Sequence, residues 1–224
     1  MRTGRFILLI LIIAGCMAGT PGQKAKLKYV ALGDSYTCCE GAKPDEAWPL
    51  ILTSHLNEKG VSIELSANPA RTGWTTQDLI DRELPIMEQI KPDFVTLLIG
   101  VNDWVHGVDS ATFHKNLVYI IDNTESQLSN KKNLVLITIP DFGVTPTGAQ
   151  YSGGRDIAKG IADFNSIIIK EVNKRGLKYI DIYPETKKMK NNPDLIASDG
   201  LHPSAKEYAL WEKLILPVVY TCLK

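Results

Sequence analysis

Residues 28–34 read Lys-Tyr-Val-Ala-Leu-Gly-Asp, and this stretch decides the fold. The five residues up to Leu32 form a short, mostly apolar run that stops at Gly33, which is typical of a buried strand ending in a tight turn. Similar runs follow at residues 61–65, 94–99, 134–139 and 177–182. One unit, a short buried strand, therefore recurs five times along the chain.

Longer stretches with helical spacing separate these runs, at residues 47–56, 76–90, 111–128, 157–174 and 204–219. In residues 157–174 the apolar positions Ile161, Phe164, Ile168 and Val172 lie three or four apart, so they form one stripe that can pack on a sheet. Parallel strands need a crossover between them, and each sheet face needs a cover. The alternation therefore predicts an α/β fold, a three-layer α/β/α sandwich with a five-stranded parallel sheet.

The composition is that of an ordinary globular protein, with 224 residues, 44% hydrophobic and 22% charged. Lys and Arg number 25, against 25 Asp and Glu. This balance leaves no basic field to attract a phosphate backbone, so it argues against nucleic-acid binding.

The amino terminus has the pattern of a secretory signal. Arg2 and Arg5 precede an unbroken apolar run over residues 6–14, which is far shorter than the ~20 residues that span a bilayer. Residues 13–16, Ile-Ala-Gly-Cys, also resemble the lipobox of bacterial lipoproteins, in which the cysteine becomes the acylated first residue. The alternative is that the run is a buried first helix or strand of the domain.

We therefore expect a signal peptide at residues 1–15, a tether at residues 16–27 beginning with lipidated Cys16, and a single domain at residues 28–224. Removing residues 1–15 takes away two arginines and no acidic residue, so the mature chain is mildly acidic. Membrane association would then rest on an N-terminal lipid anchor rather than on charge or a transmembrane helix. The expected location is the bacterial periplasm or cell surface.

Candidate catalytic residues lie in loops that follow predicted strands, where open α/β sheets form their sites. Ser35 follows Gly33-Asp34 at the end of the first strand, on a turn that would expose its hydroxyl. His202 stands three residues after Asp199, just before the last helix, so Asp199 can accept the Nδ1 proton and leave Nε2 for the serine. Ser204 and Glu207 form a capping-box pattern at the start of that helix.

Four short blocks make the chain resemble the SGNH/GDSL hydrolases, from residue 28 to residue 215. They are Gly33-Asp34-Ser35, Gly73 in Arg-Thr-Gly-Trp, Gly100-Val-Asn102-Asp, and Asp199-Gly-Leu-His202-Pro, in that order. The resemblance implies a flavodoxin-like fold with Ser35 as nucleophile, His202 as base and Asp199 as its orienting carboxylate. It also implies an oxyanion hole made of the Ser35 and Gly73 backbone N–H groups and the Asn102 amide, with no cofactor and no metal ion.

Residues 70–76 and 139–146 are similar to a bacterial branch of that family described as esterase- or lysophospholipase-like. Two loops, at residues 36–41 and 103–107, differ in sequence from what is usual in this branch. Both loops would border the pocket. Trp74 and Trp104 stand beside oxyanion-hole residues, so they are candidates for lining the substrate pocket.

Other residues offer alternatives for the same chemistry. His106 shares a loop with Asn102 but has no carboxylate at an orienting distance, whereas His55 and His114 fall inside predicted helices. A metal site at residues 103, 106 and 109 lacks the spacing of known tetrahedral sites. Cys38 is a poor nucleophile candidate because it lies past the turn that ends the strand. Cys222 should lie ~25 Å from Ser35 at the far end of the last helix, so we expect no disulfide between it and Cys38 or Cys39.

The sequence thus predicts a serine esterase that acts on carboxylic esters, either lipid or lysophospholipid esters or small acyl esters, through an acyl-enzyme on Ser35. A carbohydrate acetylesterase would use the same chemistry on a different substrate. An inactive, surface-tethered binding protein on a hydrolase scaffold is the alternative of another class.

Overall fold

Five parallel strands form the central sheet of the structure, a computed structural model that describes residues 25–224. Their order across the sheet is β2-β1-β3-β4-β5. The strands are β1 (Leu27–Gly33), β2 (Ile63–Ala67), β3 (Phe94–Leu98), β4 (Leu134–Ile137) and β5 (Lys178–Ile180). The predicted five-stranded parallel sheet is confirmed, and the chain order reverses between β1 and β3, where open sheets form a crevice.

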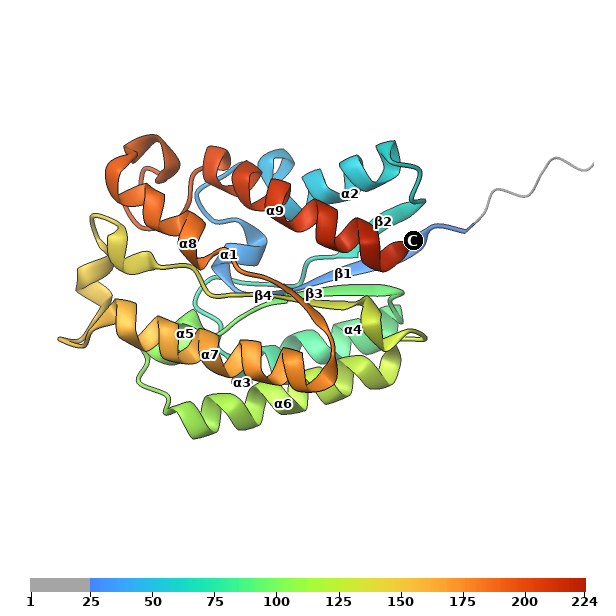
Figure 1. Cartoon of the computed structure of the whole chain (residues 1–224), viewed down its shortest axis with the longest axis horizontal. Helices are drawn as coiled ribbons and strands as arrows, with labels where there is room; N and C mark the ends of the chain where they lie inside the picture. Colours follow the sequence, from blue (N-terminus) through green and yellow to red (C-terminus); the bar gives the residue numbers. More distant parts are fainter. Residues whose placement is uncertain (1–24) are drawn as a thin grey trace, which may run out of the picture.

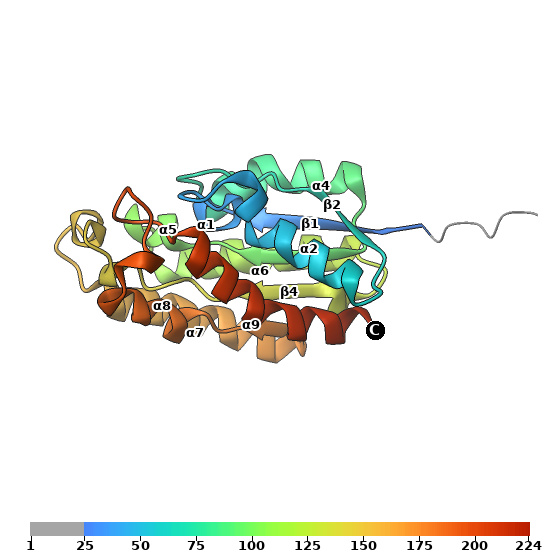
Figure 2. The same cartoon turned by 90° about the horizontal axis from the view of Figure 1, so that it is seen from above.

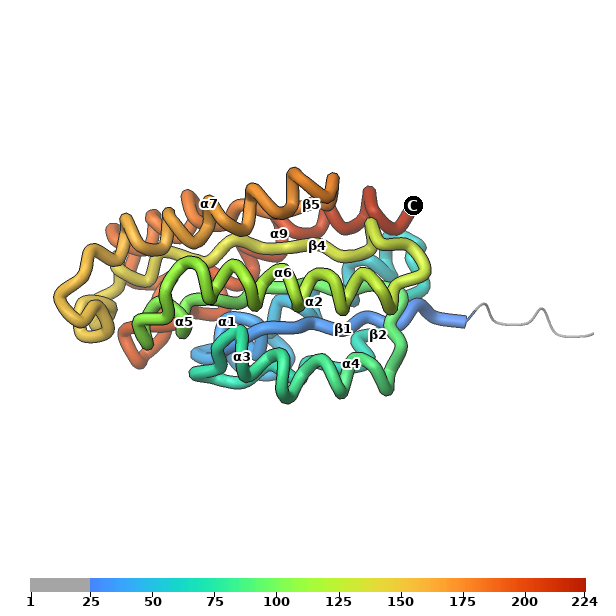
Figure 3. Tube along the Cα trace, turned by 90° about the horizontal axis from the view of Figure 1, so that it is seen from below, coloured from blue at the N-terminus to red at the C-terminus, as the bar shows by residue number. Residues whose placement is uncertain are grey.

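Helices cover both faces of the sheet (Figure 1). They are α1 (Ser35–Cys38), α2 (Trp48–Glu58), α3 (Thr76–Asp78), α4 (Leu84–Ile90), α5 (Val101–Val105), α6 (Ser110–Gln127), α7 (Ile157–Arg175), α8 (Tyr183–Thr186) and α9 (Ala205–Leu223). On one face α2 and α9 lie side by side (Figure 2), and on the other α4, α6 and α7 form a second layer (Figure 3). The predicted α/β/α sandwich is confirmed.

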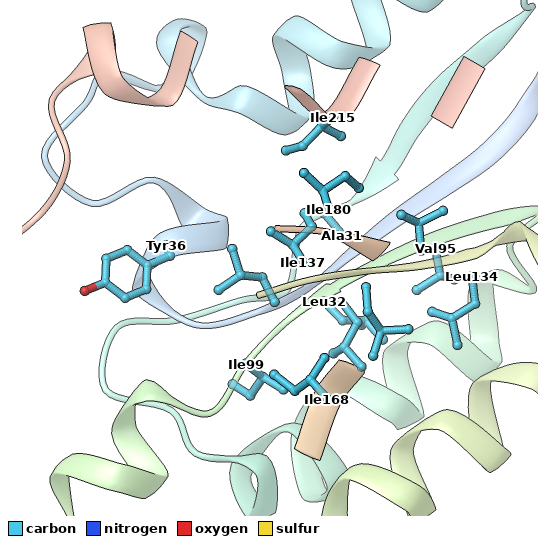
Figure 4. Packing of buried hydrophobic residues seen from close by; sticks show 14 of the residues in the cluster. Ala31, Leu32, Tyr36, Val95, Ile99, Leu134, Ile137, Ile168, Ile180 and Ile215 are labelled. Atoms are coloured by element: carbon cyan, nitrogen blue, oxygen red, sulfur yellow. The ribbon is translucent and has the colours of Figure 1, made fainter. Parts of the chain in front are cut away.

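The hydrophobic core lies on both sides of the sheet. Figure 4 shows Ile215 of α9 above the strands and Ile168 of α7 below them, with Ala31, Val95 and Ile137 of the strands between. All five side chains are at most 2% exposed. Strands β3 and β4 are buried throughout, so they read as continuous apolar runs in the sequence. Strands β2 and β5 are partly exposed, and their runs contain polar residues.

The predicted helix at residues 76–90 is in fact three pieces. A π-helical turn, Leu79–Glu83, separates α3 from α4. Pro85 lies in the first turn of α4, where it has no N–H to donate to the preceding turn, so the regular hydrogen-bond ladder is interrupted there. Glu83 is the last residue of the π-helical turn and is fully buried.

The capping box predicted at Ser204 and Glu207 is wrong. Ser204 precedes α9, but its hydroxyl donates to the Asp194 carbonyl oxygen at 2.7 Å and makes no capping hydrogen bond. Glu207 is fully buried, and its Oε1 accepts the Trp211 indole N–H at 2.8 Å. The Glu207 side chain therefore packs in the interior and bonds to Trp211 instead of capping α9.

The predicted signal peptide and Cys16 lie outside the described residues. Strand β1 begins at Leu27, one residue before the predicted start of the domain. Among the helices of residues 25–224, no segment combines the length and the apolar character needed to cross a bilayer.

Candidate active site

A cavity of about 250 Å³ opens at the carboxyl ends of the strands and brings the candidate residues together. It is lined by the predicted nucleophile, base and oxyanion-hole residues, Ser35, His202, Gly73 and Asn102, and also by Thr72 and His106. Its apolar and aromatic walls are Tyr36, Val101, Val105, Phe142, Tyr151 and Leu201. Residues from four separate blocks of the chain therefore share one small space.

Ser35 is held by the turn that links β1 to α1. The Asp34 side chain caps α1 by accepting the Tyr36 backbone N–H at 3.0 Å. A Cβ at Gly33 would overlap the Thr37 hydroxyl and the Leu98 carbonyl oxygen, so the close approach of α1 to β3 requires a glycine there. The turn leaves Ser35 only 4% exposed, yet on the cavity wall.

His202 is oriented by Asp199, as the sequence predicted. The Nδ1 atom of His202 lies 2.6 Å from Asp199 Oδ2, and Asp199 Oδ1 accepts the backbone N–H groups of Leu201 and His202 at 2.8 and 3.0 Å. Partial burial alone would raise the pKa of Asp199, but these hydrogen bonds outweigh it, so the pKa is lowered and the carboxylate form is favoured. With Nδ1 engaged, Nε2 is the ring nitrogen left for proton transfer.

No hydrogen bond joins the Ser35 hydroxyl to another group in the described part of the chain, His202 included, although the two residues share the cavity. Such catalytic hydrogen bonds are often long without substrate and shorten when it binds.

The candidate oxyanion donors lie on the opposite loops. Asn102 is the second residue of α5, two residues after Gly100, and its Nδ2 donates to the Trp74 carbonyl oxygen at 2.9 Å. An amide nitrogen carries two hydrogens, so this bond fixes the side chain and leaves one hydrogen for another acceptor. Gly73 has φ +83°, a left-handed conformation that favours glycine, and no atom of the described residues lies within 4 Å of where a Cβ would be. Conformation rather than crowding therefore accounts for the glycine.

The sequence matches the GDSL-like Lipase/Acylhydrolase family over residues 31–210. This chain belongs to that family. An arylesterase of Vibrio mimicus is 24% identical over 196 residues, which cover 88% of each chain. The family and the esterase-named relatives make this chain an ester-hydrolysing enzyme.

Solved structures share the fold. A lipase/acylhydrolase from Enterococcus faecalis superposes with a TM-score of 0.72 at 25% identity, covering 88% of this chain and 97% of that one. The acetylxylan esterase Axe2 from Geobacillus stearothermophilus gives a TM-score of 0.67 at 19% identity, covering 86% and 94%. The resemblance to the SGNH/GDSL hydrolases is thereby confirmed.

The structure corrects the prediction for the two tryptophans, because neither lines the cavity of this hydrolase. Trp104 is 5% exposed and points away, with its ring 5.8 Å from that of Phe142 and 4.1 Å from the Arg155 guanidinium. Arg155 also donates to the Trp104 carbonyl oxygen at 2.6 Å. Trp74 is half-buried, with the Arg82 guanidinium 5.6 Å from its ring. Trp104 therefore holds α5 in place by packing against Phe142 and Arg155 and does not line the cavity.

The sequence analysis did not identify the apolar and aromatic residues that line the cavity instead of the two tryptophans. Val101 and Val105 lie one turn apart on α5, and Phe142, Tyr151 and Leu201 come from three later loops. The loop that contains Phe142 falls within residues 139–146, which resemble the family. Nothing in the sequence around Tyr151 indicated that it lines the pocket.

The other histidines are placed much as expected. His106 is exposed and lines the cavity, and within residues 25–224 it has no carboxylate partner comparable to Asp199. His55 in α2 pairs with Glu212 at 3.0 Å, and His114 in α6 pairs with Glu171 at 2.9 Å.

Both acidic members of the alternative metal site have structural hydrogen-bonding roles. Both carboxylate oxygens of Asp103 accept hydrogen bonds from Thr76, and Asp109 caps α6. Within residues 25–224, no three His, Cys, Asp or Glu side chains are grouped so as to hold a metal ion.

The three cysteines of the described residues, Cys38, Cys39 and Cys222, are all free. Cys222 is in the last turn of α9, as expected. Burial raises the pKa of the Cys38 thiol, which disfavours the nucleophilic thiolate. Ser35 is therefore the better candidate nucleophile on this loop.

Proposed function

We propose that this hydrolase cleaves carboxylic esters of small acyl groups through an acyl-enzyme on Ser35. The observation that carries the proposal is the convergence of Ser35, His202 and Asn102 on one cavity, with Asp199 bonded to the far nitrogen of His202. These are the nucleophile, base, oxyanion donor and orienting carboxylate that acyl transfer needs.

Acylation begins when His202 Nε2 takes the proton of the Ser35 hydroxyl as Oγ attacks the ester carbonyl carbon. The carbonyl oxygen becomes an oxyanion, which accepts hydrogen bonds from the Ser35 and Gly73 backbone N–H groups and from the Asn102 amide. The bond to the alkoxy oxygen then breaks, and the leaving alcohol takes the proton from His202. The products are the free alcohol and an ester of Ser35.

Deacylation repeats these steps with water. His202 takes a proton from a water molecule while the water oxygen attacks the acyl carbon. The oxyanion that forms accepts hydrogen bonds from the same donors as before. When the bond to Ser35 Oγ breaks, His202 returns the proton to Oγ and the carboxylic acid leaves. Throughout, the Asp199 carboxylate stabilises the imidazolium that forms in each half-reaction.

Small acyl groups are favoured by the size of the cavity. A volume of about 250 Å³ is below the ~300 to ~1,000 Å³ typical of pockets for drug-sized ligands. Apolar walls from Val101, Val105 and Leu201 suit an acyl chain, but a cavity of this volume is too small to bury a long chain together with its alcohol. A lysophospholipid would have to leave most of its chain outside the cavity.

The export and anchoring of the enzyme form a separate part of the proposal. The basic start, the short apolar run and the Ile-Ala-Gly-Cys sequence support cleavage before Cys16 and lipidation of its thiol, which would anchor the enzyme to a membrane in the bacterial periplasm or at the cell surface. Mass spectrometry of the mature chain tests this directly. A mature chain that starts at an unmodified residue other than Cys16 would refute the anchor.

Activity on a panel of esters tests the substrate class. We expect kcat/KM on p-nitrophenyl esters to be greatest between acetyl and butyryl and to fall with longer chains, and lysophospholipids to be poor substrates. Acetylated xylo-oligosaccharides belong in the same panel, because a carbohydrate acetylesterase would act on them at least as well as on the small synthetic esters. A maximum at long acyl chains would contradict the small-acyl assignment.

A further inference from the structure

Two carboxyl groups that the proposed mechanism does not use are buried directly behind the nucleophile turn. Asp34 precedes Ser35, and Glu83 ends the π-helical turn before α4. Both residues are 0% exposed. Buried carboxyl groups without a cationic partner are costly, so their presence beside a catalytic turn calls for a physical explanation.

Each carboxyl group uses one oxygen to hold the turn. Glu83 Oε2 accepts the Gly33 backbone N–H at 3.0 Å, and Asp34 Oδ1 accepts the Tyr36 backbone N–H at 3.0 Å. The second oxygens, Asp34 Oδ2 and Glu83 Oε1, are buried and have no hydrogen-bond partner among residues 25–224. Two ionised carboxylates could not satisfy each other, because neither would carry a donor.

The two groups are brought together by the chain itself. Gly33 and Asp34 are consecutive residues with Cα atoms ~3.8 Å apart, and the Gly33 N–H holds the Glu83 carboxyl at Gly33, near enough for the Asp34 charge to raise the pKa of Glu83. We propose that Asp34 and Glu83 share one proton, with one carboxyl donating to the free oxygen of the other, and that Glu83 is a positioning residue for Ser35. This inference rests on the proposed role of Ser35 as nucleophile.

The charges around the pair favour one retained proton. Burial raises the pKa of Asp34 to about 8, and the nearby Asp103 adds to the effect. Burial also raises the pKa of Glu83 well above its usual value; Asp34 and Asp78 raise it further, while Arg71 opposes them. One of two like groups in a dry site keeps its proton well above the usual range of carboxylic acids.

Sharing a proton would make the nucleophile turn sensitive to alkaline pH. While the proton is present, the pair ties Gly33 and Asp34 to the end of the π-helical turn, and Ser35 follows in the same rigid segment. When it is lost, two negative charges face each other without water, and the turn that presents Ser35 is distorted. The expected result is a fall in kcat on the alkaline side.

The test compares Glu83→Gln and Glu83→Ala with wild type between about pH 5 and about pH 10. Glutamine can accept the Gly33 N–H and donate to Asp34 without titrating. We expect E83Q to keep kcat near wild type at neutral pH and to move the alkaline decline up by about one pH unit or more. E83A should lose about 10- to 100-fold in kcat at every pH, because small displacements of a nucleophile cost that much.

Glu212→Gln is the matched control, because Glu212 is also buried on a helix but is paired with His55 and lies outside the proposed machinery. Its pH profile should superimpose on that of wild type. An alkaline decline in E83Q identical to wild type, or no alkaline decline in wild type, would overturn the proposal.

Infrared difference spectroscopy gives a second readout that does not depend on catalysis. The carbonyl stretch of a protonated carboxyl group should lose intensity in E83Q but not in E212Q, and equal intensity in E83Q and wild type would refute the shared proton. Failure of the proposed function is detected separately, as absence of a covalent adduct on Ser35 in wild-type protein.

Discussion

Replacing Gly160 with alanine tests how α5 is held in place. Gly160 is in α7, and a Cβ there would overlap the indole nitrogen of Trp104 and lie 2.8 Å from its Cδ1. The Trp104 ring cannot retreat easily, because Phe142 and Arg155 pack against it. Trp104 is on the same short helix as Asn102, so a displaced indole also displaces the candidate oxyanion donor.

Two effects of opposite sign set the expected stability change. Gly→Ala in a helix interior is normally stabilising by about 0.5 to 1 kcal/mol, because alanine loses less backbone entropy. Overpacking a well-packed core costs about 1 to 3 kcal/mol, and the overlap with a buried indole belongs in the upper part of that range. The steric effect is the larger one, so G160A should unfold more easily and should also lose kcat.

Urea unfolding followed by far-UV circular dichroism measures the free energy of unfolding, and a double-mutant cycle with Trp104→Ala isolates the contact. W104A alone should cost about 3 to 5 kcal/mol. In that background G160A should become neutral or stabilising, which gives a coupling energy of at least about 1.5 kcal/mol. The exposed Ser166 of α7 supplies the control, since S166A should change stability by less than about 0.5 kcal/mol. A stabilising G160A in the wild-type background would refute the packing account of Trp104.

Three further substitutions probe the site and its surroundings. Asn102→Ala removes one oxyanion donor and should lower kcat by about 10²- to 10³-fold with little change in KM; an unchanged kcat would exclude Asn102 from the oxyanion hole. In Asp199→Asn the two backbone N–H donors hold the amide oxygen, so the NH₂ group faces His202 Nδ1 and forces its proton onto Nε2. The rate of acylation should fall by about 10²- to 10⁴-fold, nearer the lower figure because 41% of the Asp199 side chain is exposed. Burial raises the pKa of Glu207 from 4.5 to about 7, so the folded state keeps a proton that the unfolded chain releases, and stability falls as pH rises between those values. Glu207→Gln should remove on the order of 1 to 3 kcal/mol of that pH dependence in urea unfolding at pH 5 and pH 8, and an unchanged dependence would contradict the assignment.

The ends of β1 and β3 could be located from the sequence because the last residues of both strands are buried. Their apolar runs stop within one residue of the strand ends, so the sequence predicts that Ser35 and Asn102 follow these strands at the same edge of the sheet. His202 and Asp199 were identifiable for a different reason, since their contact is local and spans only three residues.

Residues whose placement depends on distant packing could not be predicted in this way. Whether Trp104 points into the cavity or towards α7 is decided by the space that Gly160 leaves, far along the chain. Glu83 lies four residues from both Leu79 and Met87, on the apolar face of the predicted helix, but nothing in the local sequence indicates that its carboxyl reaches the Gly33 N–H. Tyr151 reaches the cavity from a loop whose course the local sequence does not specify.

Covalent labelling with a fluorophosphonate tests the central claim most directly. The probe should phosphonylate wild-type enzyme once, and tandem mass spectrometry of the peptide that contains residues 33–41 should place the adduct on Ser35. Ser35→Ala should neither label nor hydrolyse p-nitrophenyl acetate, while retaining the far-UV spectrum of the fold. An adduct on a different residue, or undiminished esterase activity in S35A, would contradict the account.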